Sequence, residues 1–198
     1  YGNSQHGIQT FRVISDLVKK NVIQAVAGHT FSLLLIQESG KTYLMAAGES
    51  AGGKLGLGSS PGTQVKVFTR LSALDGVGVN FIAAKKKHCV ALTKKGEVYS
   101  WGINEFGQLG HGHLENVTKP KKIAFFKDKQ VLAASALYNS TLFIAKSANE
   151  EIPKLYMAGE NMTLKGKEKS KEKLKLPITL DYFNDKNIMK IHAGANHA

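Results

Sequence analysis

Two short stretches of this 198-residue chain have residue types and spacing that could support chemistry. Residues 48–54 nearly match a phosphate-binding loop, but Leu55 stands where a Ser or Thr must contact magnesium. The pair His111 and His113 could place two imidazoles near a metal ion, yet no cysteine or carboxylate cluster completes such a site. We therefore predict no cofactor and no metal site.

Catalytic groups are equally hard to find. No serine or cysteine nucleophile stands beside a histidine in a recognisable context, and no pair of carboxylates recurs in a motif. The only cysteine, Cys89, rules out an internal disulfide, and nothing indicates secretion. We predict a protein without catalytic residues in this segment, without a membrane span, and with an intracellular, cytoplasmic or nuclear location.

Lysine is the most abundant charged residue. The net charge is +12, with 27 basic and 15 acidic residues, and only Arg12 and Arg70 are arginines. In residues 165–175 a lysine occupies every second position, so an extended segment would project them to one side. Such a patch could bind nucleic acid, an acidic protein or anionic lipid, or it could be a solvated loop. The scarcity of arginine argues against sequence-specific DNA reading. The candidate partner-binding residues here are Lys167, Lys169 and Lys171.

Glycine motifs recur along the chain, and the fold that they indicate determines where these lysines lie. The clearest motif covers residues 101–112 (WGINEFGQLGHG), and weaker copies begin at Gly2, Gly48 and Gly159. The leading glycines are 46, 54 and 57 residues apart, which indicates a repeat architecture with a period near 50. Glycine suits tight turns and close backbone approach. The predicted structural repeat positions are Gly28, Gly48, Gly53, Gly56, His88, Trp101, Gly102, Gly107, Gly110, Gly159 and His197.

A strand-like run precedes each glycine motif. Phe31, His88, Tyr138 and His197 share a register among small and apolar residues. We expect the first three runs to be inner strands of four-stranded antiparallel sheets, each followed by a turn and a further strand. The repeat length and the short strands predict an all-β protein, a β-propeller built of four-stranded antiparallel blades.

The motif around Trp101, with the preceding residues 88–100, closely resembles the repeat of the regulator-of-chromosome-condensation family. The resemblance implies a seven-bladed propeller, of which this chain is an incomplete ring. Residues 1–198 would then be part of one domain, whose remaining blades come from the same protein or from another chain. The expected repeat units are 1–21 (partial), 22–75, 76–126, 127–184 and 185–198 (partial), with a lysine-rich loop at 165–175.

The resemblance also suggests where a partner binds. In the family, the turn that carries Lys85, Lys86 and Lys87 lies near the central channel at one face of the ring, so these lysines would make that opening positive. A solvated turn is the simpler interpretation.

Two functions are compatible with the family. The first is a non-catalytic protein-interaction module of a larger, multi-domain protein, which docks a partner on one face of the ring. The alternative is a guanine nucleotide exchange factor for a Ran-type small GTPase, with chromatin binding. The expected partner is a protein, acidic or a small GTPase, while nucleic acid or a nucleosome is less favoured.

Overall fold

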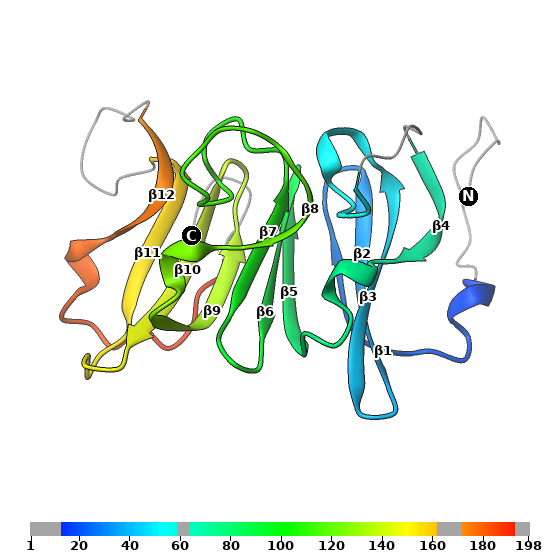
Figure 1. Ribbon diagram of the computed structural model, residues 1–198, viewed down its shortest axis with the longest axis horizontal. Helices are drawn as coiled ribbons and strands as arrows, with labels where there is room; N and C mark the ends of the chain where they lie inside the picture. Colours follow the sequence, from blue (N-terminus) through cyan, green and yellow to red (C-terminus); the bar gives the residue numbers. More distant parts are fainter. Residues whose placement is uncertain (1–12, 59–63, 162–171, 193–198) are drawn as a thin grey trace.

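Three four-stranded antiparallel sheets stand side by side along the molecule in the computed structural model, which describes residues 13–58, 64–161 and 172–192 (Figure 1). Neighbouring strands in each sheet are also consecutive in the chain, so every sheet is a simple meander. The first sheet comprises β1 (Asn21–Ala27), β2 (Phe31–Glu38), β3 (Lys41–Glu49) and β4 (Gln64–Arg70). The second comprises β5 (Val79–Lys85), β6 (His88–Thr93), β7 (Val98–Gly102) and β8 (Val117–Lys122). The third comprises β9 (Lys129–Ala136), β10 (Ser140–Ser147), β11 (Lys154–Glu160) and β12 (Lys173–Thr179).

Short 3-10 helices lie between or beside the strands in the described residues. One precedes the first strand of each sheet, one follows β3, and one follows β12. No helix within the described ranges is long and apolar enough to cross a bilayer. The five helices are η1 (Ser15–Leu17), η2 (Ala51–Gly53), η3 (Ser72–Leu74), η4 (Ala124–Phe126) and η5 (Asp181–Phe183).

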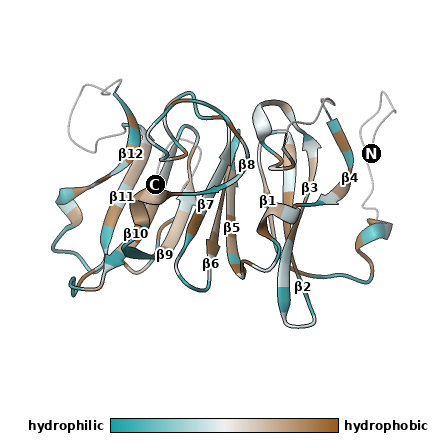
Figure 2. Cartoon of the chain, viewed as in Figure 1, coloured by the Kyte–Doolittle hydropathy of each residue, from teal (hydrophilic) through white to brown (hydrophobic). Residues whose placement is uncertain are grey.

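The core lies between the sheets. Strand β6 is buried on both faces: Cys89 and Ala91 pack with the first sheet, whereas Val90 and Leu92 pack with the third. Successive side chains of a strand point to opposite faces, so a sheet between two others needs a continuous apolar run. The hydrophobic colours of Figure 2 follow these inner strands. The all-β fold of four-stranded antiparallel blades, incomplete in this chain, is thus confirmed.

The sheets converge at one edge. The first strands β1, β5 and β9 contact one another across the sheets, whereas β4, β8 and β12 form the opposite edges. The runs at Phe31 and His88 begin the second strands, β2 and β6, which are paired on both sides. These runs therefore lie one strand away from the converging edge, and the innermost strands are the small-residue segments that precede them.

The predicted register of Tyr138 is wrong by two residues. Phe31 pairs with Gly48 and His88 pairs with Gly102, but it is Ser140 that pairs with Gly159. Tyr138 lies in the turn before β10. The prediction failed because the residues at 133–136 are all small, so the sequence pattern matches equally well after a shift of two residues. Such a shift keeps every side chain on its own face of the sheet, and alternation cannot detect it.

Candidate functional site

One end of the three sheets collects most of the predicted functional residues. It carries the turns at 28–30, 86–87 and 137–139, together with the connections that follow β3 and β7 at 50–58 and 103–116. We call this end the turn face. The opposite end carries the hairpin turns at 39–40, 94–97 and 148–153, and we call it the hairpin end.

Glycine connections on the turn face hold neighbouring sheets together. A Cβ on Gly53 would lie 2.6 Å from the Cα of Thr118 in the second sheet, and a Cβ on Gly107 would lie 2.7 Å from the carbonyl oxygen of Leu174 in the third. Both glycines adopt positive φ angles, +78° and +86°, which side chains disfavour. The repeat glycines therefore allow the connection between the third and fourth strands of one sheet to lie directly against the last strand of the next sheet.

Hydrogen bonds complete each of these contacts. The Trp101 indole Nε1–H donates to the carbonyl oxygen of Lys54 at 3.1 Å, and the Thr141 hydroxyl donates to the carbonyl oxygen of Gln108 at 2.7 Å. Trp101 is fully buried. It contacts the connection of the preceding sheet, so its packing role extends across two sheets.

Among the remaining predicted glycines, Gly28 lies in the turn before β2 and against the Phe31 ring. The others occupy equivalent places in different sheets. Gly48, Gly102 and Gly159 stand at the ends of β3, β7 and β11, with φ between +109° and +119°. Gly56 lies against Trp101, and Gly110 lies against Pro177.

His88 is a structural residue between two sheets. Its Nε2 lies 2.9 Å from the Thr141 hydroxyl, and its Nδ1 has no hydrogen-bond partner among the described residues. Burial lowers the pKa of His88 to about 4, so the ring is neutral at physiological pH. His197, predicted at an equivalent position, lies outside the described residues, as do Lys167, Lys169 and Lys171.

The turn at Lys85–Lys87 is held by both neighbouring sheets. The backbone N–H of His29 donates to the carbonyl oxygen of Lys86 at 3.1 Å, and the Lys86 ammonium lies 3.2 Å from the centroid of the Tyr138 ring. Lys86 has a positive φ of 39°, which is uncommon outside glycine. Lys87 approaches Glu105 at 3.7 Å. The contribution of Tyr138 to this cluster was not foreseen, because the incorrect register placed it in a strand.

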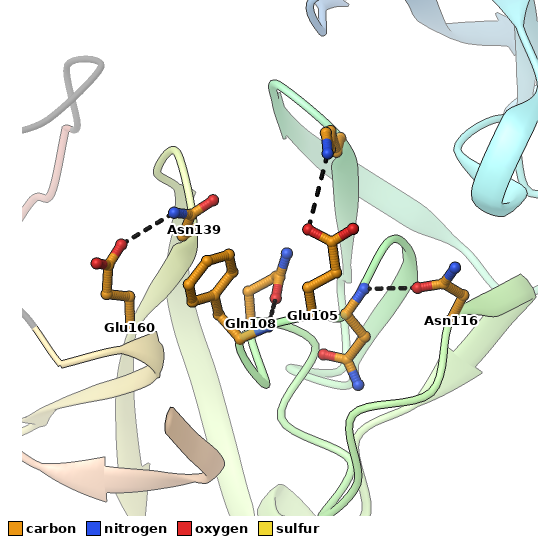
Figure 3. A network of polar contacts seen from close by, with 8 residues as sticks. Glu105, Gln108, Asn116, Asn139 and Glu160 are labelled. Atoms are coloured by element: carbon orange, nitrogen blue, oxygen red, sulfur yellow. Dashed lines mark hydrogen bonds and ion pairs between the residues drawn. The ribbon is translucent and has the colours of Figure 1, made fainter. Parts of the chain in front are cut away.

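Three carboxylates near this turn, including Glu105, are engaged in contacts within the chain. Glu49 bonds to Thr30 at 2.6 Å and to Lys54 at 2.9 Å. Glu160 accepts a hydrogen bond from the Asn139 side chain at 2.9 Å, and Figure 3 shows this pair and, apart from it, Glu105 with its ion pair to Lys87. Lys85 and Lys86 form no ion pair with the described residues. Positive charge therefore remains available at this turn.

The predicted lysine-rich loop at 165–175 ends earlier than expected, because Lys173, Leu174 and Lys175 belong to β12. At the turn face, the backbone N–H of Asn161 donates to the carbonyl oxygen of Glu172 at 3.1 Å. Just beyond them, the Lys173 ammonium lies 5.4 Å from the centroid of the Phe106 ring.

The stretches that resemble a phosphate loop and a metal site have structural roles. Lys54 is only 5% exposed, and its ammonium is bonded to Glu49 and to the Thr30 hydroxyl, at 3.3 Å. His111 lies 3.0 Å from the Ser100 hydroxyl, and burial lowers the pKa of its imidazole to about 4. The rings of His111 and His113 are stacked at 5.8 Å, and no group of three potential ligands surrounds a metal position within the described ranges.

Comparison with known families assigns the repeat. Two family models described as the regulator of chromosome condensation (RCC1) repeat match residues 95–144 and 79–108. Residues 79–144 therefore match the RCC1 repeat, as the motif around Trp101 predicted, and the stacked four-stranded sheets are those of an RCC1-like propeller.

Three proteins that are similar to this chain are all larger than the matched segment. Human E3 ubiquitin-protein ligase HERC2 is 41% identical over 113 residues, which are 56% of this chain and 2% of that protein. Ultraviolet-B receptor UVR8 of Arabidopsis thaliana is 33% identical over 62% of this chain and 27% of its own length. Prp20p from Saccharomyces cerevisiae shares the fold, with a TM-score of 0.71 and 20% identity over 88% of this chain and 42% of that one. The chain thus spans well under two thirds of these relatives.

Proposed function

We propose that this chain is part of a non-catalytic, intracellular protein-interaction propeller, which docks an acidic partner on its turn face. The observation that carries the proposal is the lysine turn at 85–87, where Lys85 and Lys86 remain without a carboxylate partner in the described chain. The nearby Glu49 is already paired with Lys54, and Glu105 is paired with Lys87, so neither carboxylate is engaged with Lys85 or Lys86.

The geometry of the turn suits recognition. Lys86 is held against Tyr138 and by the backbone of His29, so its turn is ordered before a partner arrives. Preorganised groups lose less conformational entropy on binding than mobile ones. Tyr138 is 39% exposed and offers an aromatic surface beside the positive charge, a combination frequent at protein interfaces.

The similar proteins are compatible with this role. Prp20p is described as binding Gsp1p and histones, and it shares the fold of this chain. HERC2 and UVR8 contain matching segments within different larger proteins. A repeat found in such varied proteins supports a module that binds partners, with any ligase activity residing outside the matched segment.

The exchange-factor alternative rests on the likeness to Prp20p, which at 20% identity concerns the fold alone. No contact among the described residues of this chain favours nucleotide exchange over simple docking. We therefore prefer the interaction module, with a small GTPase as one of the acidic partners to be tested.

Charge reversal tests the proposal. The chain with Lys85→Glu, Lys86→Glu and Lys87→Glu should lose its partner in quantitative capture from cell extract, followed by binding measurements with each captured protein after purification. We expect a loss of at least tenfold in affinity, because favourable charge pairs become repulsive. Circular dichroism should stay unchanged, because the three side chains are not part of the core. The melting temperature should fall only slightly, through the lost contacts of Lys86 with Tyr138 and of Lys87 with Glu105.

The matched control reverses three lysines at the hairpin end, Lys41, Lys94 and Lys95, which are exposed. Both triple variants change the net charge equally. If the two variants lower the affinity for a purified partner to the same extent, binding depends on the overall charge of the chain and the turn face is not the docking site. Unchanged binding by the variant at 85–87 would also reject the proposal.

A further inference from the structure

The outermost strand of each sheet carries positive charge and no carboxylate. The sequences of β4, β8 and β12 are QVKVFTR, VTKPKK and KLKLPIT, which contain lysine or arginine but neither aspartate nor glutamate. By contrast, β3 and β11 each carry a glutamate as well as a lysine. The charged residues of the edges that face away from the converging strands are therefore all positive.

The edges of β8 and β12 belong to one continuous surface, because the connection at 103–116 bridges them. The backbone N–H of Gly112 donates to the carbonyl oxygen of Lys175 on β12 at 2.8 Å. Toward the second sheet, His111 lies 3.0 Å from the hydroxyl of Ser100, which pairs with Lys121 of β8. We call the surface formed by β8, residues 111–112 and β12 the rim.

The rim presents lysines that lack a carboxylate partner. Lys119, Lys121 and Lys175 are exposed and form no ion pair with any residue in the described ranges. Two apolar side chains lie among them on β12, where Leu176 is 49% exposed and Ile178 is 40% exposed. The rim thus combines positive charge that is not neutralised with exposed aliphatic groups.

Protection of the sheet edges explains only part of this composition. Lysine and proline on an edge strand discourage pairing with a strand of another molecule, and Pro120 and Pro177 lie on β8 and β12. Glutamate protects an edge as lysine does, so protection alone does not require a single sign of charge. It also does not explain the exposed Leu176 and Ile178, because apolar side chains make an edge more prone to association.

We propose that the rim is a peripheral binding surface for a membrane that contains anionic lipids. The lysines meet the phosphate and carboxylate groups of the lipids, while Leu176 and Ile178 enter the boundary between headgroups and acyl chains. A nucleic acid would also contact the lysines, but its phosphates would then lie against the two aliphatic side chains. The mixture of lysine and aliphatic groups therefore favours a bilayer.

Binding through the rim is weak and reversible. Each lysine close to an anionic bilayer raises the affinity about fivefold, and salt screens this contribution. The contribution of the aliphatic side chains does not depend on charge. The rim is separate from the lysine turn at 85–87, so this inference does not rest on the acidic partner proposed for the turn face.

Co-sedimentation with vesicles tests the rim. The chain should bind vesicles made of equal parts of phosphatidylcholine and phosphatidylserine, and should not bind vesicles of phosphatidylcholine alone. Lys119→Gln, Lys121→Gln and Lys175→Gln in one variant should lower the affinity for the anionic vesicles by about tenfold or more. Circular dichroism should show that this variant is folded, because the three side chains are exposed.

Two variants that remove the same number of charges serve as matched controls. The first neutralises Lys41, Lys94 and Lys95 at the hairpin end, and it should change the affinity by less than about threefold. The second neutralises Lys167, Lys169 and Lys171 in the lysine-rich segment. An equal loss in the rim variant and in the hairpin control would overturn the proposal, and so would a loss confined to the second control.

The aliphatic side chains distinguish a bilayer from a nucleic acid. Leu176→Ser with Ile178→Ser should weaken binding to the anionic vesicles several-fold and leave its salt dependence unchanged, because only apolar contact is lost. The same variant should leave any binding to a DNA duplex unaltered. If the chain binds the duplex through the rim lysines while the serine variant binds vesicles as well as the original chain does, the rim is a nucleic-acid surface and the membrane proposal is wrong.

Discussion

His88 shows how a single residue can couple stability to pH. Burial lowers its pKa to about 4 in the folded chain, whereas an unfolded histidine has a pKa near 6.5. Protonation therefore favours the unfolded state. The stabilising effect of the neutral ring is complete above about pH 6.5 and falls as the pH drops toward 4.

This difference gives a measurable pH dependence. Between pH 7 and pH 5 the free energy of unfolding should fall by about 2 kcal/mol through His88 alone. In His88→Gln, which has an amide that can still bond to Thr141, the fall measured by urea denaturation should be smaller by that amount. A parallel dependence in both proteins would show that His88 is not the responsible group, and His111 would then be the next candidate.

The two sheet contacts use different residue pairs at one position. His88 bonds to Thr141 between the second and third sheets, whereas Phe31 and Cys89 share a core cluster between the first and second. We expect His88→Phe and Thr141→Cys each to destabilise the chain by about 1–3 kcal/mol. His88→Phe removes one of the two hydrogen bonds of the Thr141 hydroxyl, and Thr141→Cys leaves the buried Nε2 of His88 without its oxygen partner.

The double variant should recover part of this loss, since it recreates the pair used between the first two sheets. A coupling energy of about 1 kcal/mol or more is expected from a double-mutant cycle. Strict additivity of the two single variants would indicate that the positions do not act as a pair.

At the scale of the element, the glycine connection is the unit that joins the sheets. Gly107 combines a positive φ with close backbone atoms of Leu174 and Lys175, whereas Gly76 has a similar φ of +74° and nothing within 4 Å of its Cβ position. Gly76→Ala should cost about 1–2 kcal/mol for the backbone conformation alone. Gly107→Ala should cost clearly more, because the connection must also move away from the third sheet. Equal midpoints of chemical denaturation would contradict this role.

Much of this element could be predicted from the sequence. The spacing of Gly53 and Gly56 repeats at Gly107 and Gly110, because the same backbone contact occurs twice. The register of the third sheet could not be predicted as well. The run at 133–136 fits at two positions two residues apart, and only the strand pairing of Ser140 decides between them. Tyr138 lies in the turn beside Lys86 only because Ser140, and not Tyr138, begins the pairing of β10. The sequence therefore predicted the lysines of this cluster but not the aromatic ring.

At the scale of the whole molecule, the sheets form part of a propeller with chemically different ends. The turn face carries unpaired lysines beside Tyr138, while the hairpin end carries lysines in simple turns. The glycine connections that order the turn face also fix the distance between neighbouring sheets. The docking surface that we propose is therefore built by the same repeat that builds the fold.

The most direct measurement is a nuclear magnetic resonance titration of the labelled chain with an octaglutamate peptide, which is a simple acidic probe. The account predicts shift changes concentrated at His29, Lys85–Lys87 and Tyr138, and weaker binding as ionic strength rises, because exposed charges are screened over about 8–10 Å at physiological salt. The Lys85, Lys86 and Lys87 to Glu variant should abolish these changes. Equal shifts at Lys41, Lys94 and Lys95, or an unaltered response of the triple variant, would contradict an acidic docking site on the turn face.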